Sequence, residues 1–380
     1  MHLQRDTPPN PPGLSLGRHG LMLGKRLLAP VWMRLGRLET RCLRDRLPAI
    51  DRPLYITGMA RAGSTITLDM LSRHRDLAAH RYLDMAQPYL PFVWNRLAAR
   101  LPLRRAEPVP RIHDDRILVT RDSPEAVEES LWQHFFPWLH DESRPAVLGE
   151  DTRHAAFESF YRATLAKLLL ARGKPRYLSK ANYNLTRIAY LLRVVPGARF
   201  IVLFREPQAH FASWMKQHRL FTDLQRRDRR WLGVLDAVGH HEFGLDQRFV
   251  HTGRADHPRL RALWNEGRFA EAFGRHWSAL YGHVLDLVNT SPAAREAVLF
   301  VRYEDLCAHP AEVIGRMLDH AQLDRASFAP VQSHFEGRLS LPRYYGARLD
   351  DTEASELDQS TRSTRGRLGR HCELARGVSP

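Results

Sequence analysis

Short apolar segments alternate with amphipathic segments along much of the chain. Four runs have the character of strands buried on both faces of a sheet. They are residues 54–57, 176–179, 199–204 and 298–301. Each is followed by a segment with helical periodicity, at about residues 64–73, 185–194, 207–219 and 310–321. This alternation predicts an α/β domain with a parallel sheet.

Two further segments have their own signals. Residues 122–132, "DSPEAVEESLW", predict a helix with Asp122 or Ser123 as its cap and Pro124 in its first turn. Residues 220–275 are rich in charge and tryptophan without clear strands. We expect them to form a helical insertion near the mouth of the active site.

The two ends of the chain differ from its middle. Residues 1–16 are rich in proline and are expected to be disordered. Residues 18–49 mix leucine, methionine and tryptophan with arginine in a helical pattern, which allows them to pack on their own domain or to lie on an anionic membrane. We therefore expect an extension over residues 1–50, a domain over 51–349 and a polar, weakly ordered tail over 350–380.

The charge balance is strongly basic. The 57 Lys and Arg residues exceed the 42 Asp and Glu residues, which gives a net charge of +15. Such a surplus favours anionic partners such as nucleotide phosphates, acidic glycans, nucleic acid or a membrane face, and it also arises in an arginine-rich proteome. The three cysteines lie far apart and indicate neither a disulfide framework nor a zinc site. Because residues 1–13 lack an apolar signal core and no apolar run approaches about 20 residues, we expect a cytoplasmic protein.

The turn after the first strand has the residues of an anion site. Gly58 and Gly63 bracket it in the spacing G-x-x-x-x-G, and Arg61 lies between them. The N–H groups of the following helix start would point at a bound anion. Ser64 stands where an ATP-binding loop has its lysine, and Thr65 stands where that loop has its magnesium ligand. The turn is therefore either a phosphate site of another kind or only a capped turn.

A second candidate phosphate-binding site, or grip, follows the third strand. Arg205 comes directly after the strand, and Ser213 lies two turns into the helix that Pro207 opens. Ligands of open α/β sheets bind beyond the carboxyl ends of the strands, so Arg205 would reach the ligand unless it pairs with Glu206 or another acid. Two separate grips suggest a nucleotide with phosphates at both ends of its ribose.

Together these segments resemble the PAPS-dependent sulfotransferases, which use 3′-phosphoadenosine 5′-phosphosulfate (PAPS). The turn is similar to their 5′-phosphosulfate loop, and Arg205 with Ser213 is similar to their 3′-phosphate motif. Residues 298–323, "VLFVRYEDLCAHPAEVIGRMLDHAQL", resemble the family's late strand, its V-R-Y-E-D-L signature and the next helix. The resemblance runs from about residue 54 to 323. It implies a P-loop-like three-layer α/β/α domain with a central parallel sheet and helical insertions, which binds PAPS and needs no metal.

The resemblance also implies the donor site. Its phosphosulfate loop would be formed by Arg61, Ala62, Gly63, Ser64 and Thr65, with the backbone N–H groups from Ala62 to Thr65 holding the 5′ end of the nucleotide. Its 3′ end would meet the second grip, Tyr303 in the V-R-Y-E-D-L signature and, as a late serine, Ser340. Gln217 stands where some relatives carry a further arginine.

The catalytic roles follow from the same resemblance. Asp84 falls where the family has a glutamate that acts as general base, and His80 competes with it because imidazole titrates near neutrality. Lys180 looks like the lysine that contacts the transferring sulfuryl group, with Asn182 as a helper, unless it is only a surface lysine. Arg61 would share the stabilisation of the bridging oxygen.

Three functions therefore compete. The first is transfer of a sulfuryl group from PAPS to a hydroxyl or amine, on a carbohydrate or glycolipid suggested by Trp94, Trp132, Trp138 and Trp231. The second is a P-loop nucleotide kinase, which the missing lysine opposes. The third is a non-catalytic basic protein that binds nucleic acid or a membrane. Nucleic acid is disfavoured because the arginines do not alternate with aromatic residues as in a stacking surface.

Overall fold

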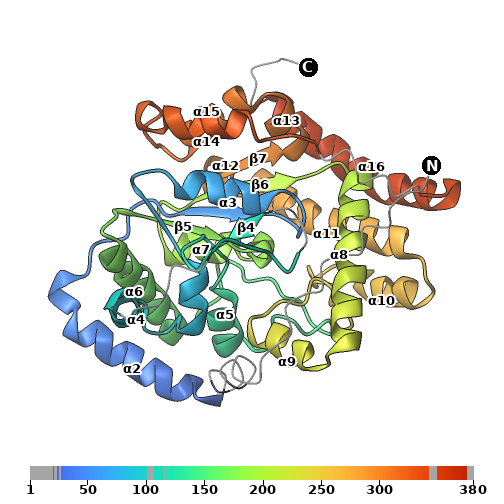
Figure 1. The fold of residues 1–380 in the computed structure, drawn as a ribbon. Helices are drawn as coiled ribbons and strands as arrows, with labels where there is room; N and C mark the ends of the chain where they lie inside the picture. Colours follow the sequence, from blue (N-terminus) through green and yellow to red (C-terminus); the bar gives the residue numbers. More distant parts are fainter. Residues whose placement is uncertain are drawn as a thin grey trace.

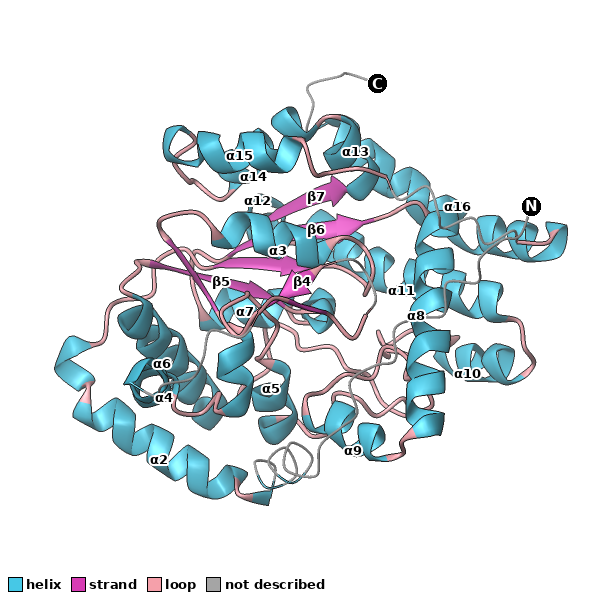
Figure 2. Ribbon diagram, viewed as in Figure 1, coloured by secondary structure: helices cyan, strands magenta, loops and turns pink. Residues whose placement is uncertain are grey.

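The computed structural model describes residues 20, 24, 27–100, 107–113, 117–341 and 349–374. A five-stranded sheet crosses its centre (Figures 1 and 2). In spatial order its strands are β2 (Leu77–Ala79), β5 (Arg176–Lys180), β1 (Leu54–Thr57), β6 (Arg199–Phe204) and β7 (Val298–Arg302). All four pairings are parallel. The predicted parallel sheet is confirmed, and β2 is the strand that the apolar pattern did not predict.

Alternation along the strands builds two cores. In β1, Leu54 and Ile56 point to one face of the sheet and Tyr55 points to the other. The first face packs against helices α3 (Ser64–Ser72), α14 (Pro310–His320) and α15 (Ala329–Glu336). The second face packs against α6 (Ala155–Arg172), α7 (Ile188–Val194), α8 (Pro207–Arg227) and α11 (Phe269–Thr290). The molecule is therefore a three-layer α/β/α domain, as expected.

The remaining elements lie around the central sheet and its two main layers of helices. A short antiparallel ribbon of β3 (Val109–Pro110) and β4 (Leu118–Val119) lies apart from the main sheet. Residues 220–275 contain the end of α8, then α9 (Arg230–Ala237), α10 (His257–Asn265) and the start of α11. The other helices are α2 (Ala29–Cys42), α4 (Pro91–Arg100), α5 (Glu129–Phe135), α12 (Pro292–Ala297), α13 (Tyr303–Ala308) and α16 (Asp351–Leu374).

The helix expected over residues 122–132 begins later, at Glu129. Pro124 forms an isolated antiparallel bridge with Arg81, and the N–H of Glu125 donates to the carbonyl of His80 at 3.0 Å. These contacts hold residues 123–125 extended beside residues 80–82. The sequence that resembles a helix cap therefore forms a β-bridge between two loops.

The tail also differs from its expectation, because residues 351–374 form α16. This helix packs along α11 and buries Leu357, Thr361 and Leu368 on one stripe. The two helices approach closely at Gly274, where a Cβ would lie 2.1 Å from the Ser360 Oγ. The stripe contains few large apolar residues, and the rest of the segment is polar. For this reason the sequence pattern predicted a weakly ordered tail.

The N-terminal extension lies partly outside the described residues, including the expected disordered segment 1–16. Its helix α2 packs on α6 through a face that includes Met33. Among the described helices, none combines the length and the hydropathy needed to cross a bilayer.

Candidate active site

The turn between β1 and α3 has the backbone of an anion-binding loop. Gly58, Arg61 and Gly63 all have positive φ angles, of 153°, 78° and 97°. A Cβ at Gly58 would lie 2.3 Å from the Leu203 carbonyl oxygen, and one at Gly63 would lie 2.3 Å from the Tyr303 ring. Only glycine therefore fits at either position. Helix α3 begins directly afterwards at Ser64, so its first N–H groups open on the turn.

The back of this turn is fixed by two buried side chains that the sequence did not single out. The Tyr281 hydroxyl donates to the Leu203 carbonyl at 2.8 Å and accepts from the Met59 N–H at 3.1 Å. His210 Nε2 lies 2.8 Å from the Ala60 carbonyl oxygen. Burial lowers the pKa of His210 to about 3, so it is neutral and donates this N–H. Both contacts hold the turn rigid before any ligand binds.

The structure brings together the two predicted phosphate-binding segments, which are the turn with Arg61 and the segment with Arg205 and Ser213. Arg61 donates from Nε to the Ser213 Oγ at 3.2 Å. The Arg205 guanidinium lies 5.4 Å from the centre of the Tyr303 ring and 3.6 Å from Glu304 Oε1. Arg205 therefore lies beside a neighbouring acid, Glu304.

Arg61, Arg205 and Tyr303 line a cavity of about 680 Å³. Its wall includes Arg61, Gly63, Ser64, Thr65, Lys180, Arg205, Tyr303 and Ser340, all expected from the sequence. Two expected residues lie behind that wall. Ala62 is fully buried, and its N–H is already donated to the Met59 carbonyl at 3.1 Å, so it is not available to a phosphate. Ser213 is absent from the wall and is bonded to Arg61, which is part of it.

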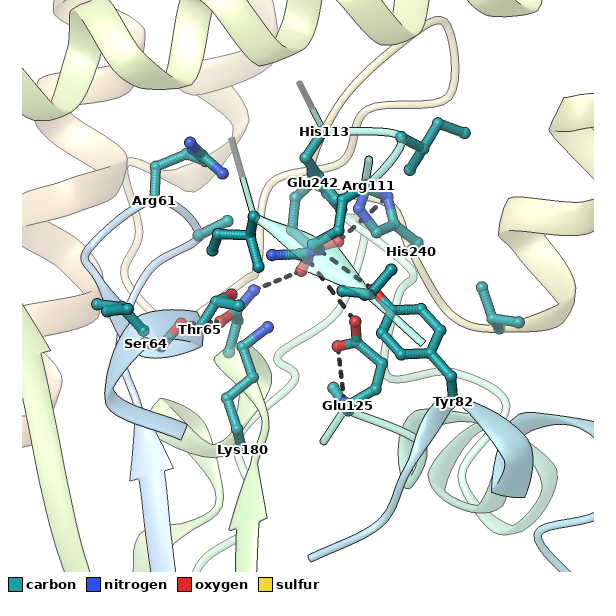
Figure 3. A pocket seen from close by; sticks show the side chains of 18 of the residues that line it. Arg61, Ser64, Thr65, Tyr82, Arg111, His113, Glu125, Lys180, His240 and Glu242 are labelled. Atoms are coloured by element: carbon teal, nitrogen blue, oxygen red, sulfur yellow. Dashed lines mark hydrogen bonds and ion pairs between the residues drawn. The ribbon is translucent and has the colours of Figure 1, made fainter. Parts of the chain in front are cut away.

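Lys180 enters the cavity from the carboxyl end of β5 (Figure 3). Burial and the positive charge of Arg111 lower its pKa, while the carboxylates of Glu125 and Glu242 oppose the shift. Asn182, just beyond the strand, donates to Glu242 Oε1 at 2.8 Å and lies 3.4 Å from the Ser64 hydroxyl. Lys180 is thus a desolvated amine beside the turn, and two nearby carboxylates favour its charged form.

The wall across from the turn presents Glu125 together with Arg111 and Tyr82 (Figure 3). Arg111 Nη2 lies 3.7 Å from Glu125 Oε2, and Arg111 donates from Nε to the Tyr82 hydroxyl at 3.2 Å. Burial works to raise the pKa of Glu125, but the charges of Arg111 and Lys180 outweigh it and lower that pKa. Glu125 is therefore a carboxylate that is coupled to Lys180 across the cavity.

Asp84 lies elsewhere, so its expected role as general base is corrected. It is fully buried and is absent from the cavity wall. Its carboxylate accepts from Arg172 at 2.7 Å, from Asn95 at 2.9 Å and from the Arg81 N–H at 2.8 Å. The competing base, His80, is also buried and lies 3.5 Å from the same carboxylate. The short helical turn over residues 82–86 directs Asp84 toward α6, where it joins two segments of the fold.

Gln217, which stands where some relatives carry a further arginine, contacts His113. Its amide donates to the His113 carbonyl at 2.7 Å and accepts from His113 Nδ1 at 3.1 Å. Of the four tryptophans expected at the acceptor pocket, only Trp231 is part of the cavity wall that the structure describes. Trp132 is buried in the core, and Trp94 donates to the Leu83 carbonyl.

His113 is a cavity residue that the sequence did not single out. Burial and the nearby cations lower its pKa well below its usual value, so the ring is neutral. Because the Nδ1–H donates to the Gln217 amide oxygen, Nε2 carries the lone pair. The residue follows Arg111 in a short loop after β3, where no sequence signal indicated a site.

Comparisons with known proteins agree with this geometry. A sequence model described as "Sulfotransferase family" matches residues 53–251, which is more than half of the chain. The structure is similar to sulfotransferase STF1 from Mycobacterium tuberculosis H37Rv, at 12% identity and a TM-score of 0.51, over 91% of this chain and 86% of that one. Sulfotransferase STF9 from Mycobacterium avium is 16% identical with a TM-score of 0.49, over 96% of this chain and 87% of that one. A search of curated protein sequences found no match. The fold, the turn after β1 and the family match together show that this chain belongs to the sulfotransferase family.

Proposed function

We propose that the protein transfers the sulfuryl group of PAPS to a hydroxyl group of an acceptor. The observation that carries this proposal is the convergence of Arg61, the start of α3 and Lys180 on one side of the cavity, with Glu125 across from them. Cationic and N–H donors on one side suit a leaving nucleotide, and a carboxylate on the other side suits the removal of a proton. A nucleotide kinase lacks support because Ser64 replaces the lysine of its phosphate loop.

The hydrogen-bond donors of the cavity fit a nucleotide with two anionic ends. The N–H groups at the start of α3 and the Arg61 guanidinium would bind the phosphosulfate, with Arg61 oriented by Ser213. Arg205, buried against the Tyr303 ring, would meet the 3′-phosphate, and Ser340 lies at the rim of the same cavity. When bound, PAPS supplies the sulfuryl group and a good leaving group.

Residues of the cavity wall would move the acceptor's proton and stabilise the charge of the leaving nucleotide. Glu125 would accept the proton of the acceptor hydroxyl as its oxygen forms a bond to sulfur. At the same time the bond between sulfur and the bridging oxygen breaks, and Lys180 and Arg61 would stabilise the charge on that oxygen. Anions beside Lys180 would offset its pull on Glu125 and so raise the pKa of the carboxyl toward that of an effective base.

The apolar side chains of the cavity wall suggest an acceptor with an apolar portion. They include Ile112, Phe221, Trp231, Val234, Leu235 and Phe243. Such a surface suits the lipid part or apolar face of a glycolipid better than a free sugar, whose hydroxyls need polar partners. We therefore propose a glycolipid or another hydroxylated amphiphile.

Two measurements test the proposed function. Thermal unfolding with 3′-phosphoadenosine 5′-phosphate (PAP), with ATP and magnesium, and with single-stranded DNA should show stabilisation by PAP alone, since a ligand of the native state raises its stability. Transfer of radiolabelled sulfate from PAPS to a panel of glycolipids, sugars and aryl alcohols should label the amphiphiles. Stabilisation by ATP and magnesium without an effect of PAP would instead favour the kinase.

A further inference from the structure

Helices α2 and α4 carry an exposed apolar surface at the edge of the domain. On α2, Leu35 and Leu38 are 39% and 52% exposed, and Leu28 and Val31 are also exposed. At about 100° per residue, these four positions fall within about 80° of one another around the helix axis. They therefore form one stripe beside the face that packs on α6.

Helix α4 extends this surface. Its Val93 and Leu97 are 50% and 48% exposed and lie one helical turn apart. Glu39 joins the two helices, because its Oε1 accepts from the Val93 N–H at 2.6 Å while its Oε2 lies 2.9 Å from Lys167 Nζ on α6. Figure 1 shows α2 along the outer edge of the molecule, below α4 and α6. The Glu39 contacts thus fix the two helices that carry these exposed apolar side chains beside each other.

A row of arginines runs beside the stripe. Arg34, Arg37 and Arg41 are exposed and fall within about 60° of one another on the side of α2 next to the leucines. Arg44 and Arg46 continue the row beyond the helix. Over residues 29–46, Asp45 is the sole exposed carboxylate, because Glu39 is buried against Lys167. Apolar and strongly basic surfaces therefore lie side by side.

We propose that the surface formed by Leu28, Val31, Leu35, Leu38, Val93 and Leu97 docks on an anionic lipid membrane, with the adjacent arginines contacting the headgroups. A helix in this position buries its apolar side chains at the headgroup boundary and gains from the negative surface potential. A second copy of the chain suits the surface less well. A twofold contact between two antiparallel α2 helices would place their arginine rows on the same side of the interface, and like charges repel across such an interface.

Vesicle co-sedimentation of the full chain tests this surface and requires neither PAPS nor an acceptor. The wild type should bind vesicles of phosphatidylcholine with about 30% phosphatidylglycerol at least about tenfold more tightly than vesicles of phosphatidylcholine alone. Leu35→Glu with Leu38→Glu should lower the affinity for the anionic vesicles by about tenfold or more, because it adds like charge and removes apolar area. Arg34→Ala with Arg37→Ala should lower it by about tenfold and weaken its salt dependence.

A matched control is Leu245→Glu, which makes the same chemical change at an exposed leucine, 42% accessible, outside this surface. It should bind vesicles like the wild type. All variants should keep the wild-type circular dichroism and unfolding temperature, since the altered side chains are exposed. Wild-type vesicle binding by the Leu35 and Leu38 variant, or no preference for the anionic lipid, would overturn the proposal. So would a dimer in analytical ultracentrifugation that this variant abolishes while vesicles fail to bind the wild type.

Discussion

The Arg61 guanidinium donates to the hydroxyl of Ser213 at 3.2 Å, across 152 residues of sequence. Arg61 has a positive φ angle in the turn after β1, and Ser213 lies in the second turn of α8. The contact therefore joins the two grips that the sequence suggested separately. It also places the Ser213 hydroxyl against a cationic side chain of the cavity wall.

Ser213→Ala is expected to weaken the binding of PAP by about fivefold, because Arg61 loses a hydrogen bond of about 1 kcal/mol that orders it. Isothermal titration calorimetry measures this change. The control is Ser72→Ala, which removes a hydroxyl that bonds to the Asp69 carbonyl at the far end of α3. Equal affinities of the Ser213 variant and the wild type would mean that the hydroxyl does not position Arg61 for the ligand.

Glu125→Gln is expected to lower kcat by about 10²–10³, the effect of removing a general base. The amide keeps the shape of the side chain, so PAP should bind nearly as before. Steady-state transfer of labelled sulfate together with PAP titration separates the two effects. A variant that turns over at the wild-type rate would exclude Glu125 as the base, and His113→Ala would then be the next variant to measure.

Lys180→Ala should reduce kcat by about a hundredfold while the dissociation constant of PAP changes by about threefold or less. The reason is that charge on the bridging oxygen grows in the transition state, where the ammonium acts most strongly. Lys180→Arg is the control, since it retains the charge. If the alanine variant loses PAP affinity and kcat stays constant, the lysine is a binding residue only.

The sequence predicted the frame of the site better than its chemistry. Strands β1, β6 and β7 were found because each has at least three successive large apolar residues, and β5 was found although only Tyr177 and Leu178 are apolar. Strand β2 has three residues and gave no comparable signal. The loop residues Arg61, Gly63 and Ser64 were found because the turn requires a particular backbone. Such local signals can be recognised in the sequence without knowledge of the tertiary structure.

The proposed base, Glu125, could not be found in this way, because the direction of a carboxylate depends on its distant partners. Asp84 is turned inward by Arg172 of α6. Glu125 is held at the cavity by the bridge between Pro124 and Arg81, in a segment whose sequence resembles a helix start. Both outcomes depend on contacts between segments far apart in the chain.

Asp84 should instead affect the pH dependence of stability. Its pKa is about 2 in the folded protein against a usual value of 3.8, because the contacts with His80 and Arg172 outweigh burial, which acts in the opposite direction. A carboxyl with a lowered pKa stabilises the fold above its unfolded pKa and loses this contribution as the pH falls through its folded pKa. The contribution is about 2 kcal/mol at neutral pH and should disappear between about pH 4 and pH 2.

Urea unfolding of wild type and Asp84→Asn at several pH values measures this contribution. The variant should be less stable at pH 7, and the difference should shrink as the pH approaches 2. Its PAP affinity should remain that of the wild type, since Asp84 is not on the cavity wall. A difference that stays constant with pH would show that the charge of Asp84 is not the source of its effect.

Helix α16 is expected to be an integral part of the domain. Leu357 is fully buried among the core residues beside α11. Leu357→Ala should therefore lower the free energy of unfolding by about 2–5 kcal/mol, through lost apolar contact and the cavity left behind. The control is Leu341→Ala, at an exposed leucine, 47% accessible, where the same truncation should change stability by about 0.5 kcal/mol or less. If both variants unfold at the same urea concentration as the wild type, α16 does not contribute to the stability of the core, and the close approach to Gly274 has no energetic role.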